Sequence, residues 1–562
     1  MLPKIHFVLQ KRTLRSGKSQ RFVLRIINVR IKEFEVKRYL GKDPETGEDL
    51  YSPVFREEKP LGYERENSAN RAIYLEAQVN YNRTFGMHNI TGMLLFNQRE
   101  YVDLNADSRG NIPYRRRGFA GRITYSIADK YLLEGNFGYN GSENFPKGKR
   151  FGFFPSGSLG WIVSNENFWG IDAINRLKLR VSYGKVGNDQ IGQRFLFLST
   201  VNTDGQYYYF GDEQTQYKGM EENAIGNPNV TWEESTKTDV GFDLGLFNDK
   251  ISLQVDFFHE SRKGILLQRA TIPQVTGIYP WSIPYGNIGK IKNKGVDALL
   301  EVRNTTNSGF FYSFRGNFTF ARNKVIENDE PTKKYPYLSG KGKRLNQPFG
   351  FVAEGFFRDE ADIQSSPYQA LGSVRPGDVK YKDINGDGVI DSYDQVAIGY
   401  PRLPEISFGF GGTVGYKGFD LSVYFTGAAH ATVDIGGFGM WAFYDGLGSN
   451  NILKEYYDNR WTPENPNARY PAIDVGNNPN NFVTSTVWKK NGNYLRFRNA
   501  EIGYTLKNIN KKYGISQFRV FLNGMNLHTW DHVKIMDPES NDGWGQYPLQ
   551  RSFNIGFQID FN

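Results

Sequence analysis

The chain has 562 residues, no cysteine, 61 glycines, an aromatic content of 15% and a mean hydropathy of −0.56. Its net charge of +9 is local: residues 1–42 carry twelve Lys or Arg against two Glu, +10 in all, which leaves about −1 for the other 520 residues. This distribution excludes a nucleic-acid-binding surface over most of the chain, and the lack of an apolar run of about 18 residues excludes a helical membrane protein.

Residues 1–30 form an atypical basic segment. The segment has no uninterrupted apolar run and no small-residue cleavage site, so it does not fit a secretory signal. Two interpretations of this segment stay open: a DNA-binding arm and a non-native N-terminus. We predict that this segment lies outside the native fold and that the folded domain covers residues 31–562.

From about residue 71 onward, apolar and polar residues alternate with the two-residue period of a strand that has one apolar face. The pattern predicts hairpins that pair 71–81 with 89–98, 117–128 with 131–140, 150–163 with 177–185, 238–247 with 251–259, 295–302 with 310–321 and 406–416 with 419–429. A last strand covers 553–561. Strands of about a dozen residues exceed the 5–6 usual in soluble proteins and approach the roughly 9–11 that cross a bilayer.

The connections between these strands alternate in length. Short turns such as 128–130, 248–250 and 417–418 join the members of a pair, whereas long polar segments separate the pairs: 187–231, 263–289, 324–346, 431–492 and 530–550. Outer-membrane barrels have such short periplasmic turns and long extracellular loops. The predicted fold class is therefore all-β, a transmembrane antiparallel β-barrel. We find sixteen strands and expect one missed strand between Lys324 and Tyr400.

Several long motifs, in order along the chain, resemble one known family. They are YNGSENFPKGKRFGFFPSGSLGW (139–161), LKLRVSYGKVGNDQIG (177–192), YKDINGDGVIDSYDQVAIGYPRLPEISFGF (381–410), NYLRFRNAEIGYTL (493–506), FLNGMNLHTWDHVKIMDPE (521–539) and YPLQRSF (547–553). Over residues 60–562 the chain resembles the barrel of the SusC/RagA family of TonB-linked outer-membrane proteins of Bacteroidetes.

The resemblance implies a barrel of roughly 22 strands that holds a plug, with a TonB box before it. The sequence shows about 16–18 strands and no recognisable plug or TonB box. We therefore expect residues 31–562 to be the C-terminal part of a TonB-dependent receptor-like β-barrel. An open sheet edge in lipid leaves about five unpaired backbone groups per strand, a cost of tens of kcal/mol against a stability of about 5–15 kcal/mol.

For function, the resemblance implies uptake of oligosaccharides or peptides across the outer membrane. A SusD-like surface lipoprotein would capture the substrate, and the TonB–ExbB–ExbD complex would supply the energy. A non-transporting surface binding or structural barrel protein, a non-functional remnant and a soluble all-β enzyme stay open as alternatives. No catalytic motif supports an enzyme, and no nucleic-acid partner is expected.

The strongest local motif is an EF-hand-like loop. Oxygen-bearing side chains stand at loop positions 1, 3, 5, 9 and 12, glycine stands at position 6, and a main-chain carbonyl would be the ligand at position 7. The predicted metal ligands are Asp383, Asn385, Asp387, Val389, Asp391 and Asp394. We expect Ca²⁺ in a structural role; the alternative is a metal-free loop closed by Asx turns.

Aromatic residues in the long segments could stack on the faces of an incoming sugar, although barrels also carry interfacial aromatic girdles. Tyr207, Tyr208, Tyr209 and Trp281 belong to this group. The predicted substrate-binding residues are Trp441, Tyr444, Trp461 and Trp488.

Overall fold

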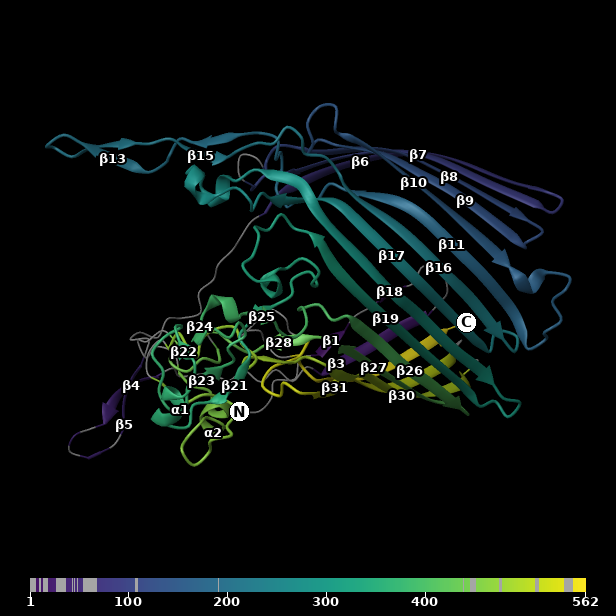
Figure 1. Cartoon of the computed structure of the whole chain (residues 1–562). Coiled ribbons are helices and arrows are strands. Elements are labelled where there is room, and N and C mark those ends of the chain that lie inside the picture. Colours follow the sequence, from purple (N-terminus) through teal and green to yellow (C-terminus); the bar gives the residue numbers. More distant parts are fainter. Residues whose placement is uncertain are drawn as a thin grey trace.

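The computed structural model describes residues 68–106, 110–190, 192–437, 439–444, 451–474, 478–510, 515–539 and 549–561, with shorter pieces near the N-terminus at 7–9, 12–13, 19–26, 37–42, 44, 46–47 and 49–53. Long strands lie side by side across the molecule, and the long loops gather at one end of them (Figure 1).

Fifteen long strands form the body of a large antiparallel sheet in the described part of the chain. They are β6 (Asn70–Phe85), β7 (His88–Asp103), β8 (Tyr114–Ile127), β9 (Tyr131–Ser142), β10 (Phe151–Ile162), β11 (Ile174–Asn188), β16 (Glu233–Leu246), β17 (Ile251–Gln268), β18 (Tyr285–Thr305), β19 (Phe311–Glu327), β26 (Ile406–Tyr416), β27 (Phe419–Ala429), β30 (Tyr494–Asn510), β31 (Ile515–Asp531) and β32 (Ser552–Phe561). Each pairs antiparallel with the next in this order, which confirms all six predicted hairpins.

The prediction of a further wall strand between Lys324 and Tyr400 is wrong, because β19 pairs directly with β26. The intervening segment forms short strands of two to four residues, which pair with one another outside the large sheet. They are β20 (Phe349–Gly350), β21 (Ala353–Phe356), β22 (Tyr368–Gln369), β23 (Val379–Tyr381), β24 (Val389–Ile390) and β25 (Val396–Ala397). A loop with its own core, described below, takes the place of a wall strand.

Three short strands fall in the basic N-terminal segment: β1 (Phe7–Leu9), β2 (Arg12–Thr13) and β3 (Ser19–Ile26). Since β3 pairs with β32, the large sheet has 18 strands among the described residues. The rest of residues 1–30 lies outside the described residues, so the exclusion of this segment from the native fold stays a prediction. The strands β4 (Lys37–Lys42) and β5 (Asp49–Pro53) pair with each other in a separate sheet.

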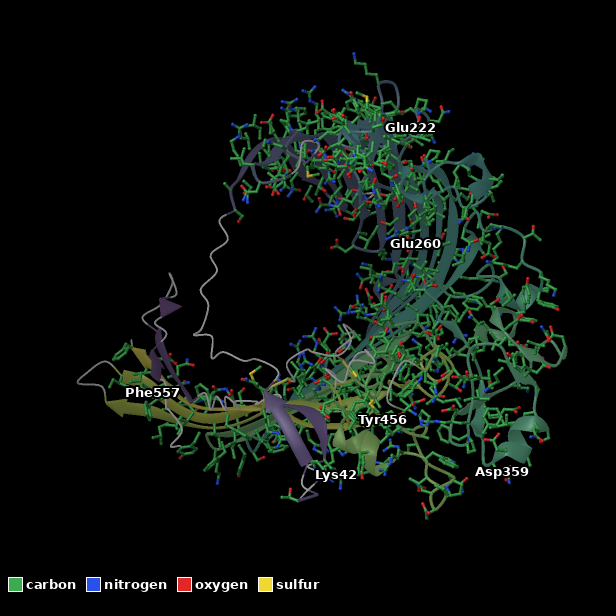
Figure 2. The ribbon with its side chains drawn as sticks, turned by 90° about the vertical axis from the view of Figure 1, so that its left-hand side faces the viewer. Lys42, Glu222, Glu260, Asp359, Tyr456 and Phe557 are labelled. Carbon is green, nitrogen blue, oxygen red and sulfur yellow. The ribbon has the colours of Figure 1, made fainter. Side chains whose placement is uncertain are left out.

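The sheet curves through most of a ring and is open on one side (Figure 2). Among the described strands, β6 has β7 as its one partner, whereas β32 pairs with β3 and β31, so one edge of β6 has no described partner. The predicted all-β, partial antiparallel barrel is confirmed, with its closure incomplete.

The two faces of the sheet differ in polarity. On β6, Ile73, Leu75 and Val79 are exposed on one face, and Glu76 and Gln78 alternate with them on the other. This is the alternation of a barrel strand, apolar toward lipid and polar toward the lumen. The polar face is called the inner face below.

The sheet ends differ as the sequence predicts. Short turns connect successive strands at one end, and the two-residue turn Lys417–Gly418 has positive φ at both residues (47° and 91°), the geometry of a tight hairpin. The opposite end, called the long-loop end, carries the connections 143–150, 189–232, 269–284, 328–405 and 430–493.

The loops at the long-loop end contain small elements of their own. They are β12 (Thr200–Asn202), β13 (Tyr207–Phe210), β14 (Thr215–Lys218), β15 (Glu221–Ala224), β28 (Thr432–Asp434), β29 (Lys489–Asn491), the helices α1 (Glu360–Gln364) and α2 (Lys454–Asp458), and the 3-10 turns η2 (Gln274–Thr276), η3 (Pro280–Ser282), η4 (Pro336–Leu338) and η5 (Ser392–Asp394); η1 (Val163–Asn165) lies at the other end. No helix in the described ranges is long and apolar enough to span a membrane.

Two groups of loops have hydrophobic cores. The large loop cluster comprises the described residues of 328–405, 430–493 and 532–539, and its buried members include Val379, Tyr456, Trp488 and Val533. The small loop cluster joins loops 143–150 and 189–232 to the ends of β10 and β17 around Trp232. The large loop cluster is the compact region around α1, α2 and β21–β24 in Figure 1.

Candidate functional site

The EF-hand-like loop lies in the large loop cluster and is closed by its own main chain. Both oxygens of Asp383 accept backbone hydrogen bonds, from Gly386 (2.7 Å) and Gly388 (2.9 Å). Asn385 accepts from the N–H of Asp387 at 2.9 Å. The carboxylate of Asp394, which is fully buried, accepts from Ile384 and Asp391, both at 2.8 Å.

The remaining predicted ligands follow the same arrangement. Asp387 accepts from the N–H of Val389 at 3.0 Å, and Asp391 accepts from the N–H of Tyr393 at 2.7 Å as the cap of η5. Burial raises the pKa of Asp383, but the N–H groups of Gly388, Gly386 and Asp387 outweigh this and keep its pKa below the usual value. An ionised Asp383 has the charge that Ca²⁺ requires, although its oxygens already accept hydrogen bonds from the backbone of the loop.

No cluster of three or more Asp, Glu or His residues among the described residues is arranged to hold a metal ion. The Asx turns therefore account for the loop conformation without a metal. Calcium binding stays a prediction for this loop, and it would require these oxygens to turn toward a common point.

Two of the four predicted substrate-binding aromatics are buried in the large loop cluster. Trp488 is 1% exposed, its indole donates to the carbonyl of Asn481 at 2.8 Å, and its ring lies against Tyr456 and Tyr470. Trp461 is 8% exposed. These rings have little surface left for a substrate, and both support the cluster.

The other two aromatics lie at the edge of this core. Trp441 is partly buried and stacks on Phe482 with ring centres 5.0 Å apart. Tyr444 packs on Trp441 at 5.0 Å and keeps 37% of its surface exposed. Substrate contact stays a prediction for all four, and Tyr444 has the most surface to offer. Tyr207–Tyr209 and Trp281 are exposed as well.

Glu405, directly before β26, joins several segments at the long-loop end. Its carboxylate is 5% exposed and accepts from Arg322 of β19 (Nη2–Oε2, 2.7 Å), from Arg344 of the large loop cluster and from His430 (Nδ1–Oε2, 3.0 Å). Burial raises the pKa of Glu405, but the two arginines outweigh this and lower it to about 2. Arg344 also lines a cavity of about 540 Å³ on the inner face, with Val325 in its wall.

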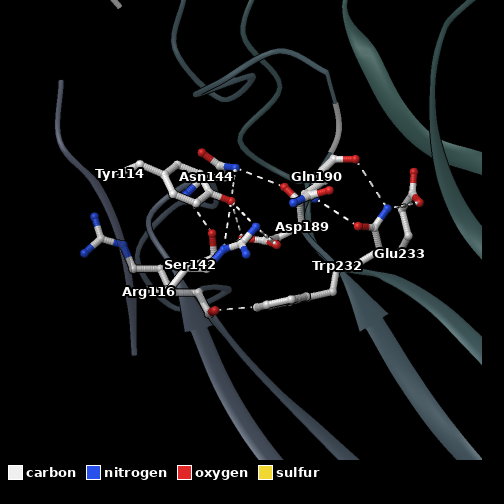
Figure 3. A network of polar contacts seen from close by, with 10 residues as sticks. Tyr114, Arg116, Ser142, Asn144, Asp189, Gln190, Trp232 and Glu233 are labelled. Atoms are coloured by element: carbon white, nitrogen blue, oxygen red, sulfur yellow. Dashed lines mark hydrogen bonds and ion pairs between the residues drawn. The ribbon is translucent and has the colours of Figure 1, made fainter. Parts of the chain in front are cut away.

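A second polar network fixes the small loop cluster to the strand ends (Figure 3). Asp189, just after β11, accepts from the hydroxyl of Tyr114 (2.8 Å) and from Arg116 through two bonds (Nε–Oδ2, 2.9 Å; Nη2–Oδ1, 2.6 Å). Glu233 accepts from the side-chain amide of Asn188 at 2.9 Å and from the backbone of Leu266 at 3.1 Å. Both carboxylates are buried, so their partners hold the adjoining loops in place.

Sequence reasoning missed this network. A partial signal was available, because strand alternation places Arg99 and Arg116 on one face of the sheet. The partner Asp189 follows Arg116 by 73 residues, and no local spacing relates the two.

A curved antiparallel sheet with one apolar and one polar face, short turns at one end and structured loops at the other defines the wall of an outer-membrane β-barrel. The comparisons specify the family. The family model "TonB dependent receptor-like, beta-barrel" matches residues 35–527, so the chain belongs to this family of outer-membrane receptors. The long-loop end is therefore the extracellular end.

Individual relatives confirm the resemblance to SusC and RagA. The chain is 26% identical to TonB-dependent receptor P3 of Formosa agariphila, covering 89% of this chain and 53% of that protein, and 27% identical to TonB-dependent receptor SusC of Bacteroides thetaiotaomicron, covering 79% and 43%. The solved structure of the RagAB peptide transporter superimposes with a TM-score of 0.69 at 20% identity, covering 88% of this chain and 55% of that one. The chain spans about half the length of the curated relatives it matches.

Proposed function

We propose that this chain forms part of the wall of a TonB-dependent importer that takes up oligosaccharides or peptides. A SusD-like surface lipoprotein delivers the substrate at the extracellular end, and the TonB–ExbB–ExbD complex supplies the energy. The observation that carries the proposal is the family match over residues 35–527, which includes nearly all of the wall. The chain acts in transport and not as an enzyme.

The RagAB structures are those of a peptide transporter and peptide importer, which supports the peptide class. The oligosaccharide class rests on the resemblance to the SusC/RagA family, and one relative is named TonB-dependent receptor SusC. The polar inner face of the wall suits a hydrated path for such substrates. Because β6 pairs with β7 alone among the described strands, the proposal also requires further strands to pair with its other edge in lipid.

Uptake measurements test the proposal. Cells that carry the gene, a deletion strain and a complemented strain are given fluorescent oligosaccharides or fluorescent peptides, with and without an uncoupler of the proton gradient. We expect uptake of one class to require both the gene and the gradient. Surface binding without uptake in the complemented strain would instead support a non-transporting binding protein.

A further inference from the structure

Charged side chains at the extracellular end of β7 and β8 are mostly paired. Arg115 pairs with Glu100 at 2.9 Å, and Arg116 pairs with Asp189 at 2.6 Å. Arg99 differs, because it forms no ion pair in the described part of the chain. Glu76 of β6 lies diagonally across from it on the same face, and the carboxylate of Glu76 accepts a hydrogen bond from the hydroxyl of Tyr74. The guanidinium of Arg99 faces an aromatic ring instead, that of Tyr101, at 5.9 Å.

Arg99 stands directly opposite Arg116 in the β7–β8 register, so both guanidinium groups lie on the inner face. Like charges directly opposite each other destabilise a sheet. Asp189 offsets one of the two charges, and both of its oxygens are already engaged by Arg116 and Tyr114. The charge of Arg99 is therefore available to an anion from outside the wall.

A cavity of about 390 Å³ opens beside this pair. Its lining consists of Arg99, Tyr101, Tyr114, Arg116, Asn144, Gln190, Gly192, Gln193 and Arg194. Among the described residues, no acidic and no aliphatic side chain belongs to this lining. Arg194 is held in place by the carbonyl of Pro113 at 3.1 Å and lies over the ring of Tyr114 at 5.1 Å. The cavity wall is thus cationic, aromatic and rich in amides.

We propose that this cavity binds an acidic sugar residue of an oligosaccharide substrate, with its carboxylate or sulfate group on Arg99. A guanidinium group forms paired hydrogen bonds with such oxyanions. The exposed amides of Gln190 and Gln193 suit sugar hydroxyls, whereas the described part of the lining offers no aliphatic side chain to a peptide. The proposal rests on the proposed import function, because it names the substrate class of the same receptor.

Binding of defined probes to the full chain in detergent micelles tests the site. The probes are trigalacturonate for the carboxylate, a sulfated trisaccharide for the sulfate, neutral maltotriose and the acidic peptide triglutamate. We expect Arg99→Gln to weaken binding of the acidic saccharides about tenfold and Arg99→Lys to weaken it less. The matched control is Arg117→Gln, which removes the same charge from the opposite face of β8 and leaves affinity unchanged.

The outcomes separate this proposal from the import function. Equal affinity of the native chain and Arg99→Gln for both acidic saccharides would overturn the site, and so would Arg99-dependent binding of triglutamate alone. If the site is overturned in either way, energy-dependent uptake of maltotriose by cells that carry the Arg99→Gln variant would still support the import function. Arg99-dependent saccharide binding without uptake of any probe would support the site and overturn import.

Discussion

In the wall, apolar side chains such as Phe257 and Leu421 remain 52% and 43% exposed on the protein surface, whereas Trp488 and Tyr456 in the large loop cluster are each 1% exposed. The wall presents its apolar residues to lipid, and its strands are connected by backbone hydrogen bonds from one neighbour to the next. The large loop cluster buries its apolar residues against one another, as a water-soluble domain does.

The cluster also satisfies its buried polar groups internally. Asp378 accepts from the side-chain amides of Asn481 (2.7 Å) and Asn478 (3.2 Å) and from the backbone of Arg375 (2.9 Å). Burial raises the pKa of Asp378 despite these bonds. These contacts link loop 328–405 to loop 430–493. The two extracellular loops are therefore fixed to each other independently of lipid. The wall and the loops should therefore lose stability to different substitutions.

The largest expected effect is that of Trp488→Ala on the large loop cluster. Removal of a buried aromatic ring costs about 3–5 kcal/mol, and here the hydrogen bond to Asn481 is lost as well. We expect proteases to cut the loops faster while the circular dichroism of the strands is retained. Trp281→Ala, at a position 57% exposed, is the control and should change little. Loss of the strand signal in Trp488→Ala would show that the two regions fold as one unit.

The substitution Phe257→Arg tests whether the apolar face of the wall meets lipid. An arginine on the lipid face near the middle of the membrane costs about 2–4 kcal/mol. Gln254→Arg places the same residue on the inner face of β17 and should be nearly neutral. Urea unfolding in lipid vesicles, followed by the strand signal, measures both. Equal costs for the two variants would contradict the assignment of the faces.

Glu405 joins the two regions, and its contribution depends on pH. Because its pKa is lowered from 4.5 to about 2, the ionised form is more stable in the folded protein. The resulting stability, on the order of 3 kcal/mol, is present above pH 4.5 and lost as the pH falls toward 2. Thermal unfolding at several pH values should show this loss in the native chain and its absence in Glu405→Gln. The exposed Glu464→Gln is the control, and an unchanged pH profile in Glu405→Gln would refute the role.

The same comparison explains what the sequence could predict. Wall strands follow a local two-residue period, so all six hairpins were predictable. The large loop cluster gathers Val379, Trp488 and Val533 from three loops without any period, so its core was not predictable. The expectation of a further wall strand between Lys324 and Tyr400 came from counting the alternation of short and long connections, and not from a strand pattern in that segment. The Arg116–Asp189 pair depends on the tertiary fold in the same way, while the EF-hand-like loop was found because its residues are contiguous.

Calcium binding would add the smallest and most local effect. The loop from Asp383 to Asp394 already accepts hydrogen bonds from its own backbone, so Ca²⁺ would gain only the difference between those bonds and its own coordination. At ten times the dissociation constant, binding stabilises the folded form by about 1.4 kcal/mol. In the native chain, we expect the unfolding temperature of the loops to be higher in calcium than in EDTA, and the unfolding temperature of the wall to be the same in both. Asp383→Asn should abolish the rise, and an equal rise with magnesium or in Asp383→Asn would show that calcium acts elsewhere.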